Sequence, residues 1–273
     1  MRGMMGKHLL LAIIFCLTAC IGRVPGRSGE QPTIVSLNPC TDAILAEVAD
    51  PVQVLAISHY SHDPRASSMD LNVARRFRAT GGTVEEVLAL DPDVVVAGTY
   101  LPPATRTVFE RLGIEVATIG IASSAAESEA QIAELAALAG HPERGVALNA
   151  RIEEAIASAR WKGPKVSTLL WQEGGIVPGR GTLIFGLLEN AGFASHSAAR
   201  GLGQGAYLPL ERVLADPPAL VLAASDERML THPVLRHLPE TQYARLDSSL
   251  LYCGGPTIVR ASARLAQLRK AIG

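Results

Sequence analysis

The aromatic side chains are the first residues in this sequence whose placement suggests chemistry. Of the five tyrosines and two tryptophans, five come directly after a predicted strand or in a loop that leads into a helix: Tyr60, Tyr100, Trp171, Tyr207 and Tyr252. Flat rings give a large contact area at a small cost in side-chain entropy, which suits a macrocycle or an aromatic chelate. Any one of them could equally be an amphipathic residue at the margin of a core. Together they indicate a binding site for a flat ligand.

Two cysteines in the body of the chain are the next candidates. Cys40 follows the first predicted strand, and Cys253 lies just before the last predicted helix. Each could be a small buried residue, the pair could form a disulfide in an oxidising compartment, or both thiols could face a ligand. Two cysteines are too few for an iron–sulfur cluster, which usually takes four. A thiol-based site for copper or a heme-like group stays open as an alternative of a different functional class.

Polar residues near the aromatic positions are weaker candidates. Arg180 lies in a segment with several glycines and could pair with a carboxylate or phosphate, or it could be a solvated loop charge. His59 and His62 could bind a metal, but two histidines three positions apart in a loop, with no third ligand nearby, are a weak pattern. We therefore expect polar residues at the rim of the site and predict no metal centre.

Several functional classes are disfavoured by what the sequence lacks. The formal net charge is -1 at pH 7, and acids and bases are scattered along the chain, so there is no basic stripe for nucleic acid. The glycines Gly201, Gly203 and Gly205 lack the last spacing and the preceding strand of a dinucleotide loop. No Ser-His-Asp set or pair of carboxylates stands out. We predict a binding protein rather than an enzyme.

The N-terminal residues are typical of an export signal. Arg2 and Lys7 precede an apolar run over 9–17, which is shorter than the about 20 apolar residues of a membrane-spanning helix. The run leads into the sequence Leu-Thr-Ala-Cys, which ends at Cys20 and resembles the bacterial lipobox. Cys20 is then expected to become the first residue and to carry lipid. The alternative is ordinary cleavage after an Ala-x-Ala-like site, with Cys20 as an unmodified thiol.

These features predict the N-terminal organisation and the location of the protein. We expect a lipoprotein signal peptide over 1–19 and a tether over 20–32, rich in Gly, Arg, Pro and Ser. Several acyl chains on Cys20 are sufficient for stable anchoring. The predicted location is the periplasm or cell envelope, with the protein held to a membrane through Cys20.

The elements that position these residues are short β-branched runs that alternate with longer helical runs. This alternation is typical of an α/β fold. Strands are expected over 34–37, 54–57, 94–97, 116–119, 166–171, 220–224 and 244–246. Helices are expected over 42–49 and 257–272, and the Ala-, Glu- and Leu-rich stretch 124–161 fits two consecutive helices, the second one long.

An internal repeat divides this pattern into two halves. The segment 84–97 matches 210–223 without a gap, and each reads as a helix followed by a strand. We therefore predict two Rossmann-like α/β lobes over 33–123 and 163–273, joined by a helical segment over 124–162. A ligand is expected in the cleft between the lobes, where the carboxyl ends of the strands meet.

The residues of several motifs resemble those of periplasmic binding proteins for cobalamin and iron complexes. The resemblance covers 32–272 and is strongest at 34–39 (Ile-Val-Ser-Leu-Asn-Pro) with Thr41 and Asp42, at 58–61 (Ser-His-Tyr-Ser), at 85–97 and at 112–114. It implies two lobes joined by a long rigid helix and a ligand cleft lined by the loops that follow the strands. Asn38, in the first motif, joins Cys40, His59, Tyr60, Tyr100, Trp171, Arg180, Tyr207, Tyr252 and Cys253 as a candidate ligand-binding residue.

The resemblance also implies a ligand and a partner. The expected ligand is a corrinoid such as cobalamin or a similar large metal chelate, with a ferric siderophore or heme as the alternative, and no resident cofactor is expected. The expected partner is the permease of an ABC importer, to which the protein delivers its ligand as a monomer.

In this family one glutamate on each lobe docks onto basic residues of the permease. The matching positions are Glu85 and Glu211, which are equivalent in the internal repeat. Both lie at predicted helix starts, where the helix dipole by itself favours an acid. Thr83 with Glu86 also makes a capping box. These effects explain an acid at a helix start, but not the same acid in both lobes.

Overall fold

The computed structural model describes residues 31–224, 232–238 and 240–272. The predicted signal peptide, Cys20 and most of the predicted tether lie outside the described residues. Within those residues, no helix combines the length and the apolar character that crossing a bilayer requires.

The first half of the chain forms a parallel five-stranded sheet in the order β3-β2-β1-β4-β5. Its strands are β1 (Ile34–Ser36), β2 (Val54–Ser58), β3 (Ala79–Thr80), β4 (Val94–Gly98) and β5 (Glu115–Ile119). Along β4, Val94 and Val96 belong to one hydrophobic cluster, and Val95 and Ala97 to another. Both faces of this strand are therefore buried, which explains its unbroken apolar sequence.

The second half forms a parallel four-stranded sheet in the order β11-β10-β6-β8 and a separate antiparallel pair, β7-β9. The strands are β6 (Val166–Trp171), β7 (Ile176–Val177), β8 (Phe193–Ser195), β9 (Ala206–Tyr207), β10 (Leu220–Ala223) and β11 (Gln242–Arg245). The order β8-β6-β10-β11 repeats β2-β1-β4-β5 of the first sheet. In each half, the first strand of the sheet pairs with the strand of the internal repeat, β1 with β4 and β6 with β10.

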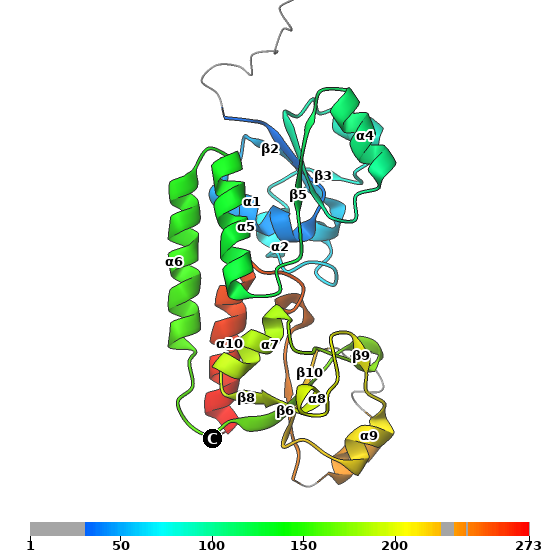
Figure 1. The fold of residues 1–273 in the computed structure, drawn as a ribbon, viewed down its shortest axis with the longest axis vertical. Helices are drawn as coiled ribbons and strands as arrows, with labels where there is room; N and C mark the ends of the chain where they lie inside the picture. Colours follow the sequence, from blue (N-terminus) through cyan, green and yellow to red (C-terminus); the bar gives the residue numbers. More distant parts are fainter. Residues whose placement is uncertain (1–30, 225–231, 239, 273) are drawn as a thin grey trace, which may run out of the picture. The chain divides into compact units, whose positions relative to one another are not determined.

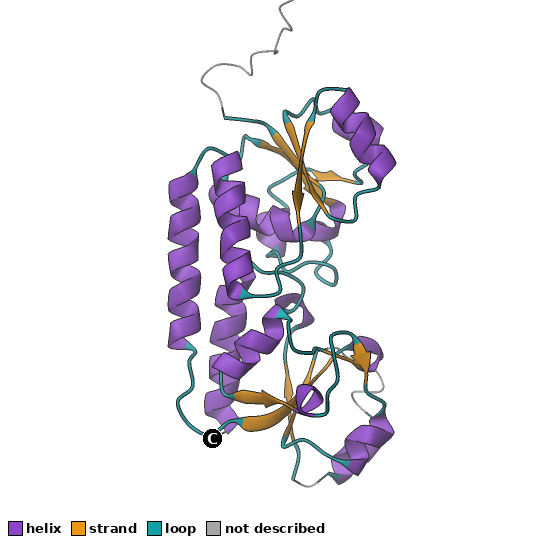
Figure 2. Ribbon diagram, in the orientation of Figure 1, coloured by secondary structure: helices purple, strands orange, loops and turns teal. Residues whose placement is uncertain are grey.

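Helices flank both sheets (Figure 2). They are α1 (Pro39–Val48), α2 (Leu71–Ala74), α3 (Val84–Leu88), α4 (Pro103–Arg111), α5 (Ala125–Leu138), α6 (Pro142–Ser158), α7 (Leu183–Asn190), α8 (His196–Ala199), α9 (Leu210–Ala215) and α10 (Thr257–Ile272). Four short 3-10 turns are η1 (His59–His62), η2 (Glu173–Gly175), η3 (Pro233–His237) and η4 (Ser248–Leu250). The repeat predicted from the sequence corresponds to α3-β4 and α9-β10.

Two consecutive helices, α5 and α6, connect the sheets, as the composition of this stretch predicted; the family resemblance alone implied one long helix. The longer one, α6, has 17 residues. The helices α5 and α6 pack side by side, and α10 packs against α6 (Figure 1). A Cβ on Gly145 of α6 would lie 2.6 Å from the Cβ of Ala136 on α5, so only glycine allows this close approach. The two sheets are thus tied to a common helical layer.

Candidate ligand-binding site

Loops at the carboxyl ends of strands from both sheets line a cavity of about 710 Å³. Its walls come from the segments after β1, β4 and β5, from the segment after β6, and from the segment before α10. We call it the tyrosine compartment, because Tyr60, Tyr100 and Tyr252 line it. The carboxyl ends of parallel strands are the usual place for a ligand in open α/β sheets.

The three tyrosines that line the cavity are exposed. Tyr60 is 53% exposed in η1, Tyr100 is 85% exposed after β4, and Tyr252 is 44% exposed before α10. The ring centroid of Tyr60 lies 4.1 Å from that of His59, with the planes tilted by 35°. Large aromatic surface that is left exposed inside a concave site is available for contact with a flat ligand.

A buried carboxyl group holds the turn that carries Tyr60. Asp42 is fully buried in α1, and its Oδ2 accepts hydrogen bonds from the Ser58 backbone N–H at 3.0 Å and the Ser61 hydroxyl at 2.6 Å. Burial raises the pKa of Asp42 to about 8, although hydrogen bonds from Ser36, Ser61 and Ser58 oppose the shift. Both bonded residues flank Tyr60, so Asp42 fixes the path of η1.

Asn38 serves the start of α1 and also lines the tyrosine compartment. Its Oδ1 accepts a hydrogen bond from the Cys40 backbone N–H at 2.9 Å, which is the usual role of an N-cap residue. A Cβ on Gly98 would lie 3.2 Å from the Asn38 Nδ2, so the end of β4 runs close against this amide.

Cys40 and Cys253 form a disulfide, with their Cα atoms 5.1 Å apart. The sequence left open buried thiols, a disulfide or thiols that face a ligand, and the structure has the disulfide. Both residues also line the tyrosine compartment. The bond joins the start of α1 to the segment before α10. A hydrogen bond from the Gly255 N–H to the Ser128 Oγ at 2.7 Å fixes the same segment against α5.

Trp171 does not line the cavity, contrary to the prediction. It is the last residue of β6, and its side chain is 0% exposed. It belongs to a hydrophobic cluster with Leu169, Val177 and Val221. Because side chains alternate between the faces of a strand, Trp171 points into this core and not toward the loop that follows. The prediction that Trp171 contacts the ligand is therefore wrong.

Three other candidates line neither this cavity nor the neighbouring one described below. Tyr207, on β9, is exposed and pairs in register with Ile176 of β7. The Arg180 guanidinium lies 5.7 Å from the centre of the Phe185 ring. The Nδ1 of His59 lies 3.3 Å from the Thr80 carbonyl oxygen. The structure does not bring these three side chains to the cavity that holds the other candidates.

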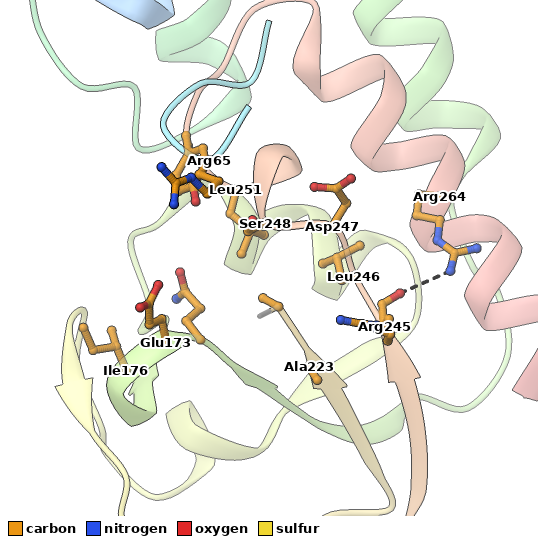
Figure 3. A pocket seen from close by; sticks show the side chains of 13 residues that line it. Arg65, Glu173, Ile176, Ala223, Arg245, Leu246, Asp247, Ser248, Leu251 and Arg264 are labelled. Carbon is orange, nitrogen blue, oxygen red and sulfur yellow. Dashed lines mark hydrogen bonds between the residues drawn. The ribbon is translucent and has the colours of Figure 1, made fainter. Parts of the chain in front are cut away.

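A second cavity has a volume of about 770 Å³, and Figure 3 shows the side chains that line it. The two cavities share Gln172, Ile176, Leu251 and Tyr252. We call the second one the basic compartment, because its lining includes Arg65, Arg245 and Arg264, together with Glu173 and Asp247. None of these arginines was among the candidate residues predicted from the sequence. Arg245 lies within the predicted strand 244–246, whereas in the structure it is the last residue of β11, so its place at a strand end could not be predicted.

The described residues contain no group of three or more His, Cys, Asp and Glu side chains that could hold a metal ion. The disulfide also removes both body cysteines from thiolate chemistry in the oxidised protein.

Glu85 and Glu211 lie at equivalent places, in the first turns of α3 and α9, and both are exposed. The N-cap of α3 is Thr83, whose hydroxyl accepts a hydrogen bond from the backbone N–H of Glu86 at 3.2 Å, and the Glu86 carboxylate binds the segment before the helix. Its Oε2 accepts hydrogen bonds from the Gly81 N–H at 2.7 Å and the Thr80 hydroxyl at 2.8 Å. Across the described part of the chain, no hydrogen bond or ion pair involves the Glu85 or Glu211 carboxylate. Helix capping therefore does not account for Glu85.

Comparison with known proteins places the chain among binding proteins. A family model described as "Periplasmic binding protein" matches residues 34–243. No curated protein sequence gives a significant match.

Solved structures match over nearly the whole described chain. A periplasmic heme-binding protein from Roseiflexus sp., in its apo form, is 22% identical with a TM-score of 0.71, over 89% of this chain and 98% of that one. A periplasmic heme-binding protein of Vibrio cholerae is 17% identical with a TM-score of 0.71, over 86% and 98%. A periplasmic vitamin B12-binding protein of Vibrio cholerae is 18% identical with a TM-score of 0.68, over 88% and 97%. The predicted two-lobe α/β fold class is confirmed.

Proposed function

Because the chain belongs to the periplasmic binding protein family, we propose that it captures a flat, metal-bearing macrocycle and delivers it to the permease of an ABC importer. At the level of the family it is a binding protein and not an enzyme, and its location is extracytoplasmic. The ligand, the site residues, the anchor and the docking surface are the parts that we propose.

The tyrosine compartment is the observation that carries this proposal. Three tyrosines from loops of both sheets meet in one cavity of about 710 Å³. Ligand cavities of about 300–1,000 Å³ bury most of a small-molecule ligand. Planar rings and apolar walls suit a corrinoid or a tetrapyrrole, and proteins of similar fold are described as binding heme or vitamin B12.

Titration followed by visible absorbance tests the proposal. Purified protein is mixed separately with cobalamin, hemin and a ferric siderophore, and each complex is passed through a desalting column. We expect one class of metal macrocycle to stay with the protein at one molecule per chain, with an unchanged ligand spectrum after release. Retention of only the siderophore favours the alternative ligand class. Conversion of the ligand into a product contradicts a binding function.

We also propose that Cys20 carries the lipid that holds the protein at a membrane. The lipobox-like residues before Cys20 and the polar segment after it support this assignment. Cells expressing the wild type and a Cys20→Ser variant are fractionated. We expect the wild type in the membrane fraction and the variant either soluble or uncleaved. A soluble wild type is evidence against the anchor.

A further inference from the structure

The two compartments differ in charge. The described residues that line the tyrosine compartment are all uncharged. Those that line the basic compartment include three arginines and two carboxylates. Placing a charged group in an enclosed site is costly unless an opposite charge meets it. Anionic groups of a ligand therefore find counter-charges, among the described residues, only in the basic compartment.

The two compartments lie next to each other and have lining residues in common. Gln172, Ile176, Leu251 and Tyr252 line both. Tyr252 in particular is in position to contact a ring in one compartment while a substituent of that ring enters the other. One extended ligand can therefore occupy both cavities.

The arginines reach the basic compartment from three different elements (Figure 3). Arg65 comes from the loop after η1, Arg245 ends β11, and Arg264 lies on α10. The Arg264 Nη2 donates a hydrogen bond to the Arg245 carbonyl oxygen at 3.2 Å, which orients its guanidinium. The Nε and Nη2 of Arg65 each donate to Asp63 at 3.3 Å. A guanidinium has five N–H donors, so Arg65 and Arg264 keep donors for a further acceptor.

The two carboxylates offset only part of this charge, because the described lining has three arginines against two carboxylates. Asp247 is engaged as the N-cap of η4, where its Oδ1 accepts from the Ser249 N–H at 2.9 Å. Glu173 acts on Arg65 through its charge and raises the pKa of that guanidinium further, after the larger effect of Asp63. Arg65 therefore stays charged, and the number of arginines among the described lining residues exceeds the number of carboxylates.

We propose that the basic compartment binds carboxylate groups on the rim of the ligand, while the ring of the ligand lies against the tyrosines. The inference rests on the proposed function and narrows the ligand to a macrocycle with carboxylate substituents. The planar arginine fork matches a carboxylate with two parallel hydrogen bonds. A macrocycle whose side groups are neutral amides gains no such pairing.

Comparing a macrocyclic acid with its ester tests the inference. Hemin, whose rim carries propionates, and hemin dimethyl ester are titrated into the wild type and into an Arg65→Gln/Arg264→Gln variant. Because each 1.4 kcal/mol of lost pairing is tenfold in affinity, we expect the wild type to prefer the acid by about tenfold or more. In the variant this preference should disappear. Affinity for the ester should not change, which also shows that the variant is folded.

An Arg111→Gln variant is the matched control, because Arg111 is exposed at the end of α4 and lines neither compartment. It should keep the preference for the acid. Equal binding of acid and ester by the wild type overturns the inference but leaves the proposed function intact, as does tight binding of cobalamin without binding of hemin. Failure to bind any of the macrocycles overturns the proposed function, and this inference with it.

Discussion

At the scale of single residues, exposure separates the aromatic candidates into two kinds. Tyr60, Tyr100 and Tyr252 are open to the cavity, whereas Trp171 is in the core. The sequence could show that these residues follow strands. It predicted the strand over 166–171 that ends at Trp171, but it could not show that the Trp171 side chain points into the core, because a register shift of one residue reverses the face that every side chain of a strand occupies. Three of the five aromatic candidates line the cavity.

Alanine substitution should distinguish these two kinds. We expect Tyr60→Ala, Tyr100→Ala and Tyr252→Ala each to weaken macrocycle binding by about 1–3 kcal/mol, with little loss of stability. Trp171→Ala should instead lower the free energy of unfolding by about 3–5 kcal/mol, because it leaves a cavity in the core. Isothermal titration and urea unfolding measure the two effects. Tyr207→Ala is the control, and a loss of affinity there as large as in the other tyrosines would speak against the tyrosine compartment.

Asp42 should make stability depend on pH. Burial raises the pKa of Asp42 from its ordinary value of 3.8 to about 8 in the folded protein. Between these values the folded state keeps a proton that the unfolded state releases, so the contribution of Asp42 to stability falls as the pH rises. Above about pH 8 both states have released it, and the contribution is constant.

We expect Asp42→Asn, which is neutral at every pH, to remove this slope. The slope from one group is at most about 1.4 kcal/mol per pH unit. Urea unfolding should be measured between pH 7 and 8, where His196 does not contribute to the slope. Burial lowers the pKa of His196 to about 4, so this residue makes stability rise with pH, but only below about pH 6.5. Wild type and variant with the same slope in this window would show that Asp42 ionises normally.

At the scale of elements, the strands and long helices could be predicted because each has a strong local pattern. Val94–Gly98 is buried on both faces and reads as a continuous apolar run. The strands β3, β7, β8 and β9 were missed because each has only two or three residues. The cavity could not be predicted in full, because Arg65, Arg245 and Arg264 come from three elements that only the tertiary fold brings together.

The disulfide joins two elements that are 213 residues apart in the sequence. Closing so long a loop constrains the unfolded chain, and removing a native disulfide typically costs about 2–5 kcal/mol. We expect the free energy of unfolding of the oxidised wild type, measured with urea, to be higher than that of a Cys40→Ser/Cys253→Ser variant by this amount. A reductant should lower the stability of the wild type and leave the variant unchanged. If the reductant changes neither protein, the two thiols are not bonded in solution.

At the scale of the whole molecule, the family resemblance seen in the sequence motifs is confirmed by the family match over residues 34–243. The motifs were informative because they lie at the ends of β1, β2 and β4, where the tyrosine compartment begins. The family does not fix the ligand, because the cavity walls vary with loops that carry no strong local pattern.

Docking onto a permease is a property of the whole molecule. We expect Glu85→Ala/Glu211→Ala to bind the ligand with normal affinity and to reduce transport severalfold in vesicles that contain the permease, because two separated charges fix orientation as well as attraction. Glu153→Ala, at an exposed position on α6, is the matched control and should transport normally. Normal transport by the double variant, or loss of ligand binding together with stability, would refute the docking assignment.

Native mass spectrometry of the protein purified from its own cell envelope tests the central claim most directly. We predict a complex of one chain with one macrocycle, identified by its mass and by the isotope pattern of its metal. The same preparation of a Tyr60→Ala/Tyr100→Ala/Tyr252→Ala variant should be empty. The claim is contradicted if the wild type is empty and stays empty after incubation with cobalamin and hemin, or if the triple variant carries the ligand as fully as the wild type does.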